Sequence, residues 1–213
     1  MTKTKDLKPK TTAVVAILLA AGRSSRMGTF KPLLPFGETT VIRSCVSKLR
    51  EGGVQNIVVV VGHRADDVKN NLDDLSVNFA LNPDPESGMS ASIACAVKEI
   101  PNATRAVLIA LGDQPAMPPE VVRVVLKEWS LGAKLVKPTF AGRGGHPVLV
   151  DLQFRSELLN LGPGGLRAFF EGNQDQLRTI AVDSPLIARD IDTWDDYRAL
   201  HKEIFGRLPV SGP

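Results

Sequence analysis

The feature that most constrains this chain is an apolar run that ends abruptly in a small, basic loop. Val14–Leu19 is apolar throughout, which suits a buried strand and is too short for a helix of its own. The loop that follows contains Gly22 and Gly28 and carries the cations Arg26 and Lys31. A loop with glycines, free backbone N–H groups and fixed positive charge is suited to bind an anion, most often phosphate. An ordinary polar turn with solvated arginines would have the same composition.

Apolar runs and segments of helical periodicity alternate along the rest of the chain. Further strands are expected at Ile57–Val61, Val77–Leu81, Ala106–Leu111, Lys134–Lys137, Pro147–Val150 and Leu177–Val182, with Ala188–Ile191 as one more candidate. Helices are expected at Val41–Arg50, Ala65–Asp74, Gly88–Ile100, Leu152–Leu159 and Trp194–Phe205, with one more from Pro118-Pro119 to about Trp129 and a short one that reaches Phe170. This alternation favours right-handed βαβ units. The predicted fold class is α/β, a three-layer Rossmann-like architecture with a mostly parallel sheet and helices on both faces.

The charge balance and the hydropathy argue against two classes of partner, nucleic acids and membranes. The formal net charge of +3 is matched by the first ten residues, where Lys3, Lys5, Lys8 and Lys10 stand against Asp6, so the body of the chain is formally neutral. A neutral body argues against a nucleic-acid partner, which would require a basic face. No stretch approaches the roughly 18 apolar residues of a membrane span, and the polar N-terminus lacks the apolar core of a signal peptide. We expect a cytoplasmic protein with no membrane partner.

The same pattern predicts one domain with loose ends. Residues 1–12 are expected to form a disordered tail, residues 13–205 a single domain, and residues 206–213 a flexible tail. Cys45 and Cys95 have no ligand-like neighbours at metal-binding spacing and are interpreted as buried, reduced thiols. His201, on the last predicted helix, is expected at the surface.

Ligands of open α/β sheets bind beyond the carboxyl ends of the strands, so the strand exits point to the candidate site. The first strand exits into the Gly22–Lys31 loop, and Ala106–Leu111 exits into a segment that contains Asp113. A later segment supplies Asp192. Two carboxylates that converge on a phosphate-binding loop make a magnesium site. Each aspartate has an alternative role, Asp113 in a turn or helix cap and Asp192 as the N-cap of the last helix.

The first loop does not fit either of two common phosphate-binding motifs. Five residues separate Gly22 from Gly28 where a Walker A loop has four, and no Lys-Ser/Thr pair follows. The dinucleotide-binding fingerprint Gly-x-Gly-x-x-Gly is also missing.

The spacing instead resembles a known signature. LAAGRSSRMGTFKPLLPFG (Leu19–Gly37) closely resembles the motif of the molybdenum cofactor cytidylyltransferase family, which are MobA-like NTP transferases of the nucleotide-diphospho-sugar transferase superfamily. Later motifs of the family follow in the same order, namely Gly88-Met89-Ser90-x-Ser92, Gly112-Asp113-Gln114-Pro115, Gly145-His146-Pro147 and Asp190-Ile191-Asp192-Thr193. Together they cover about residues 13–200, and five ordered motifs are a specific signal.

The resemblance implies a fold of the nucleotide-diphospho-sugar transferase type and a Mg²⁺-dependent nucleotidyltransferase. Such an enzyme would transfer CMP from CTP, the favoured nucleoside triphosphate, to the phosphate of molybdopterin or molybdenum cofactor and release pyrophosphate. By the same resemblance Arg26, Lys31 and Asp113 would be catalytic, and Asp113 and Asp192 would bind the metal. The residues implied in nucleotide binding are Leu19, Ala20, Ala21, Gly22, Arg23, Ser24, Ser25, Gly28, Ser90 and Ser92.

The resemblance implies a phosphorylated small-molecule acceptor, with His146 and Arg167 as its candidate binding residues. His146 would hydrogen-bond the phosphate or the pterin of the acceptor. Arg167 stands at the family's spacing, but Pro163 replaces an acid that the family commonly carries. A molybdoenzyme or its chaperone is a further implied partner.

Three alternatives remain open at this stage. The acceptor could be another phosphorylated compound, such as a sugar or polyol phosphate. The fold could serve an NAD(P)-linked oxidoreductase, although the dinucleotide fingerprint is missing. A non-catalytic nucleotide-binding or partner-binding module is the third, against which the presence of both Asp113 and Asp192 argues.

Overall fold

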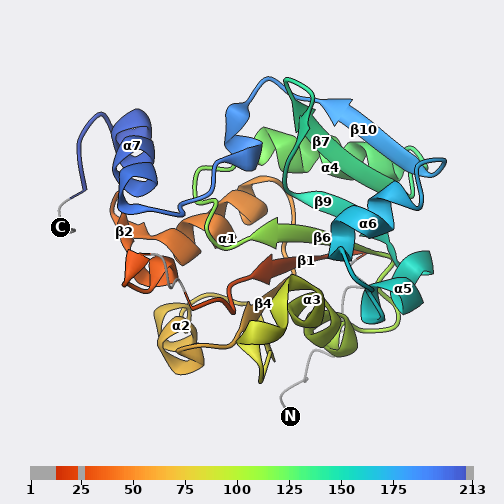
Figure 1. Ribbon diagram of the computed structural model, residues 1–213, viewed down its shortest axis with the longest axis horizontal. Helices are drawn as coiled ribbons and strands as arrows, with labels where there is room; N and C mark the ends of the chain where they lie inside the picture. Colours follow the sequence, from red (N-terminus) through yellow and green to blue (C-terminus); the bar gives the residue numbers. More distant parts are fainter. Residues whose placement is uncertain (1–12, 24–26, 210–213) are drawn as a thin grey trace, which may run out of the picture.

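The computed structural model describes residues 13–23 and 27–209, and one twisted sheet runs through the middle of it (Figure 1). The strand order is β10-β7-β9-β6-β1-β4-β5, with the short β8 paired to β7. The strands are β1 (Val14–Leu19), β4 (Ile57–Val61), β5 (Asn78–Leu81), β6 (Ala106–Leu111), β7 (Leu135–Phe140), β8 (Arg143–Gly144), β9 (Val148–Asp151) and β10 (Leu177–Ala181). All neighbours pair in parallel except β9, which is antiparallel to both β6 and β7, and β8, which is antiparallel to β7.

Helices cover both faces of this sheet, which confirms the predicted α/β class. One face packs against α1 (Val41–Glu51), α2 (Ala65–Asn71) and α4 (Pro119–Ser130). The other packs against α3 (Gly88–Glu99), α5 (Arg155–Leu159) and α6 (Gly165–Glu171). Short 3-10 turns occur at η2 (Lys31–Leu33), η3 (Pro85–Ser87), η4 (Leu152–Phe154) and η5 (Pro185–Ala188).

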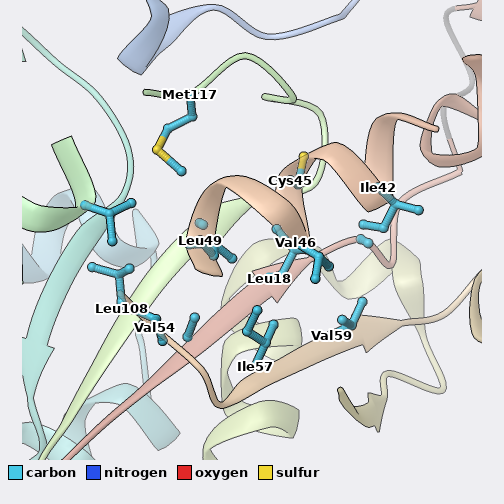
Figure 2. Packing of buried hydrophobic residues seen from close by; sticks show 14 of the residues in the cluster. Leu18, Ile42, Cys45, Val46, Leu49, Val54, Ile57, Val59, Leu108 and Met117 are labelled. Atoms are coloured by element: carbon cyan, nitrogen blue, oxygen red, sulfur yellow. The ribbon is translucent and has the colours of Figure 1, made fainter. Parts of the chain in front are cut away.

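The central strands are buried on both faces, which explains why they read as continuous apolar runs. Alternate residues of β1 point to opposite faces, so Leu18 belongs to the core under α1 and Ile17 to the core under α3. Figure 2 shows the first of these cores, where Cys45 and Leu49 of α1 lie over the sheet beside Leu18. The rigid frame that results fixes the position of the strand exits.

The last helix, α7 (Trp194–Phe205), stands apart from the two sheet faces at one end of the molecule (Figure 1). It packs against a small hairpin formed by β2 (Pro35–Phe36) and β3 (Thr39–Thr40), and the hydroxyl of Tyr197 donates a hydrogen bond to the carbonyl of Pro35. This third apolar cluster consists of Met27, Leu34, Phe36, Val41, Ala116, Ile191, Tyr197 and Leu200. The C-terminal helix therefore packs against the segment that follows the first loop.

Several sequence expectations are wrong. Ala188–Ile191 is not a strand, because the chain there leaves the turn η5 and bonds to the exit of β6 instead. The helix expected at Ala65–Asp74 ends at Asn71. His201 is buried rather than at the surface, since it packs between Phe36 and Phe205. The predicted tail at residues 1–12 lies outside the described residues. No helix within the described ranges is long and apolar enough to cross a membrane.

Candidate active site

The exits of β1 and β6 open into a cavity of about 380 Å³ at the carboxyl edge of the sheet. It is lined by Leu19, Ala20, Ala21, Gly22, Lys31, Pro32, Pro85, Gly88, Met89, Ser92, Leu111, Gly112, Asp113 and Asp190. Five of the residues expected to bind a nucleotide are among them, namely Leu19, Ala20, Ala21, Gly22 and Ser92. The structure thus joins the first loop, the start of α3 and the exit of β6 around one space, as the strand-exit argument predicts.

The two central strand exits lie close together because glycine occupies position 112. The backbone N–H of Gly112 donates to the carbonyl of Leu19 at 2.9 Å. A Cβ atom at Gly112 would lie 2.8 Å from that carbonyl oxygen and 3.1 Å from the Cβ of Ala20, so any side chain would force the strands apart. Gly112 therefore positions Asp113 directly beside the loop that begins at Ala20.

Lys31 is held at the cavity by a short turn and an ion pair. It opens η2, where Pro32 takes the second position, and its side chain is only 11% exposed. Its Nζ lies 2.8 Å from Oδ1 of Asp192. The structure thus brings together two residues that are 161 positions apart and that the sequence singled out separately. Arg26, Ser24 and Ser25, which the sequence analysis assigned to the same loop, lie outside the described residues.

Negative charge is concentrated around Asp113. Burial raises the pKa of the Asp113 carboxyl to about 6, and the charges of Asp190 and Asp192 act in the same direction, against the opposing effect of Lys31. Carboxylates crowded in this way favour a proton or a cation among them. Asp190 was not among the predicted site residues, although the motif Asp190-Ile191-Asp192-Thr193 contained it.

Gln114 is a second residue that the sequence analysis did not single out. It is buried, and its Nε2 donates to Oδ1 of Asp190 at 2.6 Å and to the carbonyl of Ile187 at 3.3 Å. The backbone N–H of Ile191 also donates to the carbonyl of Asp113 at 3.0 Å. The segment that carries both later aspartates is therefore bonded to the exit of β6. In the sequence, the only signal for Gln114 was its position next to Asp113 in the motif.

The first turn of α3 forms another wall of the cavity. The hydroxyl of Ser92 accepts from Nδ2 of Asn82 at 2.9 Å and donates to the carbonyl of Gly88 at 3.3 Å. This hydroxyl therefore already has protein partners and orients the helix start. Ser90 does not line the cavity, but its Oγ would be 3.0 Å from a Cβ at Gly165, which places it at the contact between α3 and α6.

Besides Ser90, two more of the predicted nucleotide-binding residues, Arg23 and Gly28, lie outside the cavity lining. Arg23 forms an ion pair with Glu86 at 2.9 Å, which joins the first loop to the turn before α3, and both side chains are exposed. Gly28 has a φ of +65°, a conformation that glycine adopts easily. Both residues belong to the loop at the cavity entrance rather than to its wall.

The two predicted acceptor residues occur together in a second cavity of about 440 Å³. It lies between the sheet and α6 and is lined by Lys137, Gly144, Gly145, His146, Val148, Leu166, Arg167, Phe170 and Glu171. Arg167 is exposed and pairs with Glu171 at 2.9 Å. Pro163 does not line this cavity. Asp190 lines the first cavity and not the second, although its charge raises the pKa of His146 against the larger lowering effect of burial.

The carboxylates fit a hard divalent cation. Magnesium is commonly bound by one or two carboxylates and completes its shell with water and substrate phosphate oxygens. Asp113 and the nearby Asp190 and Asp192 offer such oxygens, whereas the described residues contain no group of three or more His, Cys, Asp or Glu side chains arranged to hold a metal by themselves. A cation here would therefore depend on a phosphate ligand for part of its coordination.

Two relatives match almost the full length of the chain. The molybdenum cofactor cytidylyltransferase of Escherichia coli (strain K12) is 28% identical over 198 residues, which cover 87% of this chain and 94% of that protein. The nicotine blue oxidoreductase of Paenarthrobacter nicotinovorans is also 28% identical over 198 residues, covering 88% and 96%.

Solved structures support the same relationship. The crystal structure of Rv0371c from Mycobacterium tuberculosis H37Rv is similar with a TM-score of 0.80 and 28% identity, over 90% of this chain and 99% of that one. Another structure of that protein is a complex with manganese, with a TM-score of 0.74 and the same identity. Its sheet and helices therefore correspond to those described above.

Residues 16–180 match the family described as the MobA-like NTP transferase domain. This range begins in β1, includes both cavities except for the segment around Asp190, and ends in β10. The chain therefore belongs to the MobA-like NTP transferase family and is a nucleotidyltransferase.

Proposed function

We propose that this nucleotidyltransferase uses a divalent metal, Mg²⁺ in the cell, to transfer CMP from CTP to the phosphate of molybdopterin or molybdenum cofactor. The observation that carries the proposal is the placement of Lys31, Asp113 and Asp190 around one cavity at the exits of β1 and β6. Support for the nucleotide and acceptor comes from the similarity to a molybdenum cofactor cytidylyltransferase along nearly the whole chain. The manganese complex of a mycobacterial relative supports the divalent metal.

In the proposed reaction an oxygen of the acceptor phosphate attacks the α-phosphorus of CTP. A new P–O bond forms, the bond from the α-phosphorus to the bridging oxygen of the β-phosphate breaks, and pyrophosphate leaves with that oxygen. Because the nucleophile is already an anion, catalysis needs positioning and charge neutralisation more than a general base. Asp113 and Asp192 are the residues that would hold the metal, whose chemistry would be to offset the charge that develops on the phosphate oxygens.

The chain's own residues supply the rest of the machinery. Lys31 would bind the leaving pyrophosphate, and its ion pair with Asp192 holds it at the cavity before the nucleotide binds. Backbone N–H groups of the Ala20–Gly22 segment would contact the triphosphate. Gly112 keeps Asp113 within reach of that segment.

The direct test follows pyrophosphate release from CTP, GTP, ATP or UTP with Mg²⁺ and molybdopterin. We expect release with CTP, dependent on both the metal and the acceptor. Asp113→Asn should lower the rate by about 10²–10³, by analogy with the loss of one transition-state-stabilising group. Asp175→Asn is the matched control, because Asp175 is exposed in the turn before β10 and lines neither cavity.

Varying the acceptor in the same assay distinguishes molybdopterin from a sugar or polyol phosphate as the substrate. Release with a sugar or polyol phosphate, and none with molybdopterin, would reassign the acceptor while keeping the enzyme class. The absence of pyrophosphate release with every nucleotide and acceptor would refute the proposed function.

An oxidoreductase is the second candidate, because one full-length relative is named nicotine blue oxidoreductase. The sequence disfavours it, since the first loop lacks the glycine fingerprint that is typical of dinucleotide-binding sites. Titration of the protein with NADH and NADPH, followed by the fluorescence of the nicotinamide, decides this. Saturable binding in the micromolar range, competed by no nucleoside triphosphate, would favour the oxidoreductase.

A further inference from the structure

The second cavity contains a lysine, Lys137, beside the apolar side chains of Val148, Leu166 and Phe170. Lys137 follows Leu135 and Val136 in β7, and the alternation of the strand places it on the same face as the fully buried Leu135. That face is covered by α6, and Nζ of Lys137 lies 5.9 Å from the ring centroid of Phe170. Lys137 is half-buried in this place, where an anionic partner would compensate its charge.

No such partner is found within residues 13–23 and 27–209. Apart from the contact with the ring of Phe170, Lys137 has neither an ion pair nor a hydrogen bond through its side chain in these ranges. The acid of the cavity lining, Glu171, forms an ion pair with Arg167 at 2.9 Å. The charges of Arg167 and Glu171 cancel, and the cavity is left with one uncompensated positive charge.

The backbone beside Lys137 leaves room for its side chain. A Cβ atom at Gly144 would lie 3.2 Å from Cδ and from Cε of Lys137, so the lysine stem crosses directly over this glycine. A glycine here lets the ammonium group stay along the wall of the cavity.

His146 lines the same cavity with a defined hydrogen-bonding role. Its Nδ1 lies 3.3 Å from the carbonyl oxygen of Ile109, and because a carbonyl can only accept, Nδ1 carries the proton. Burial lowers the pKa of His146, which keeps the ring neutral. Its Nε2 is then an acceptor, and it suits an N–H or O–H group rather than an ionised phosphate oxygen.

We propose that Lys137 binds the phosphate of the acceptor in this second cavity, and that His146 accepts a hydrogen bond from an N–H or O–H group of the same molecule. This inference rests on the proposed function, because it assigns the acceptor site of that reaction. Two residues would thus recognise the acceptor. Lys137 would bind its negative charge, and His146 would accept a hydrogen bond from its donor group. The acceptor class that fits is a phosphate monoester with an N–H or O–H donor on its body.

The test measures binding to the full-length protein by thermal stabilisation and calorimetry. The probes are 6-hydroxymethylpterin phosphate and glycerol 3-phosphate, each compared with its unphosphorylated counterpart, and CTP with Mg²⁺ is measured separately. We expect the phosphorylated form of at least one probe to bind the wild-type protein about 10–100-fold more tightly, as the loss of one charged hydrogen bond would predict.

Three variants divide this preference among residues. Lys137→Met should abolish the preference for the phosphorylated probe, and Lys137→Arg should restore most of it. His146→Leu should weaken the pterin with and without phosphate by the same factor, and thus leave the preference intact. Lys134→Met is the matched control, because Lys134 pairs with Asp151 at 3.8 Å and lies outside the cavity.

A footprinting measurement on the wild-type protein keeps the test independent of how the variants fold. The phosphorylated probe should slow acetylation of Lys137 by acetic anhydride and leave Lys134 unaffected. The inference is wrong if no phosphorylated probe binds, or if Lys137→Met binds it as tightly as the wild type. If the wild-type protein does not bind CTP with Mg²⁺, the result would instead count against the proposed function. Failure of the inference and failure of the proposed function are therefore distinguishable.

Discussion

Asp113 combines a functional position with an electrostatic cost. The carboxyl is largely desolvated and faces Asp190 and Asp192, so its charged form is unfavourable until a cation arrives. The folded protein therefore favours the binding of a metal ion or a proton at this carboxyl group. The residue that the proposed reaction needs most is therefore one that destabilises the metal-free protein at neutral pH.

This cost predicts a pH dependence of stability. The pKa of Asp113 is about 6 in the folded protein against 3.8 for the ordinary side chain, so the folded state binds this proton more tightly than the unfolded state. The free energy of unfolding should therefore fall as the pH rises from about 4 to about 6, by at most about 3 kcal/mol at 1.36 kcal/mol per unit. Urea unfolding of the metal-free protein at several pH values measures it.

Asp113→Asn provides the comparison. The variant should match the wild type near pH 4 and exceed it in stability above pH 6 when a chelator is present. If the free energy of unfolding of the two proteins depended on pH in the same way, the charged form of Asp113 would not destabilise the folded protein.

A second residue-scale prediction concerns the ion pair at the cavity entrance. Glu86 holds Arg23 at 2.9 Å, and both side chains are exposed, so the pair adds little to stability. Glu86→Gln should free Arg23 for the triphosphate and tighten CTP binding by about 2–5-fold, the size of a weak surface ion pair. Calorimetry with CTP measures this affinity, and unchanged or weaker binding would contradict a contact between Arg23 and the triphosphate.

At the scale of elements, the sequence predicted the strands that are buried on both faces. The bounds of β1, β4, β6 and α7 agree with the expected ranges, because uninterrupted apolar runs and a clear cap mark them. The hairpin β2–β3 was not predicted, since its two-residue strands contain no periodicity.

The candidate site was predictable to a similar degree. Asp113 and Lys31 follow strand exits, where the parallel sheet brings loops together, and the structure places them in one cavity. Gln114 and Asp190 were not singled out, because their importance arises from a bond between segments far apart in sequence. The proline-led turn η5 and this bond also explain why the strand expected at Ala188–Ile191 does not form.

The approach of β6 to β1 can be tested with one methyl group. Gly112→Ala would place a Cβ 2.8 Å from the carbonyl oxygen of Leu19, which is backbone and cannot rotate away. We expect a loss of about 1–3 kcal/mol of stability from overpacking, together with weaker CTP binding. Gly162→Ala is the matched control, because nothing lies within 4 Å of its added methyl group. Similar behaviour of the two variants in urea unfolding would contradict the close contact.

Across the whole molecule, the C-terminal helix supports a loop close to the N-terminus. The indole Nε1 of Trp194 donates to the carbonyl of Met27 at 3.1 Å, next to Gly28. Together with the Lys31–Asp192 pair, this bond connects the start of α7 to both sides of Gly28. The site therefore depends on contacts between the two ends of the described chain, which no local pattern could reveal.

Trp194→Phe removes the hydrogen bond from α7 to the carbonyl of Met27 and keeps an aromatic ring at this position. It should weaken CTP binding by about 2–10-fold, because one hydrogen bond worth about 1 kcal/mol is lost from the loop. Trp129→Phe is the control, since the Nε1 of Trp129 donates to Asp151 at 3.0 Å and neither residue lines the first cavity. Equal CTP affinities in these two variants would show that α7 does not support the nucleotide loop.

In the proposed reaction, the enzyme transfers a nucleotidyl group rather than a phosphoryl group in the cavity beyond β1 and β6. The most direct measurement uses CTP labelled at either the α- or the γ-phosphorus, with Mg²⁺ and molybdopterin. We predict that the α-label appears in the acceptor product and the γ-label only in pyrophosphate, and that Asp113→Asn loses both signals together. Recovery of the γ-label in the acceptor, or of neither label with any acceptor tested, would contradict the account.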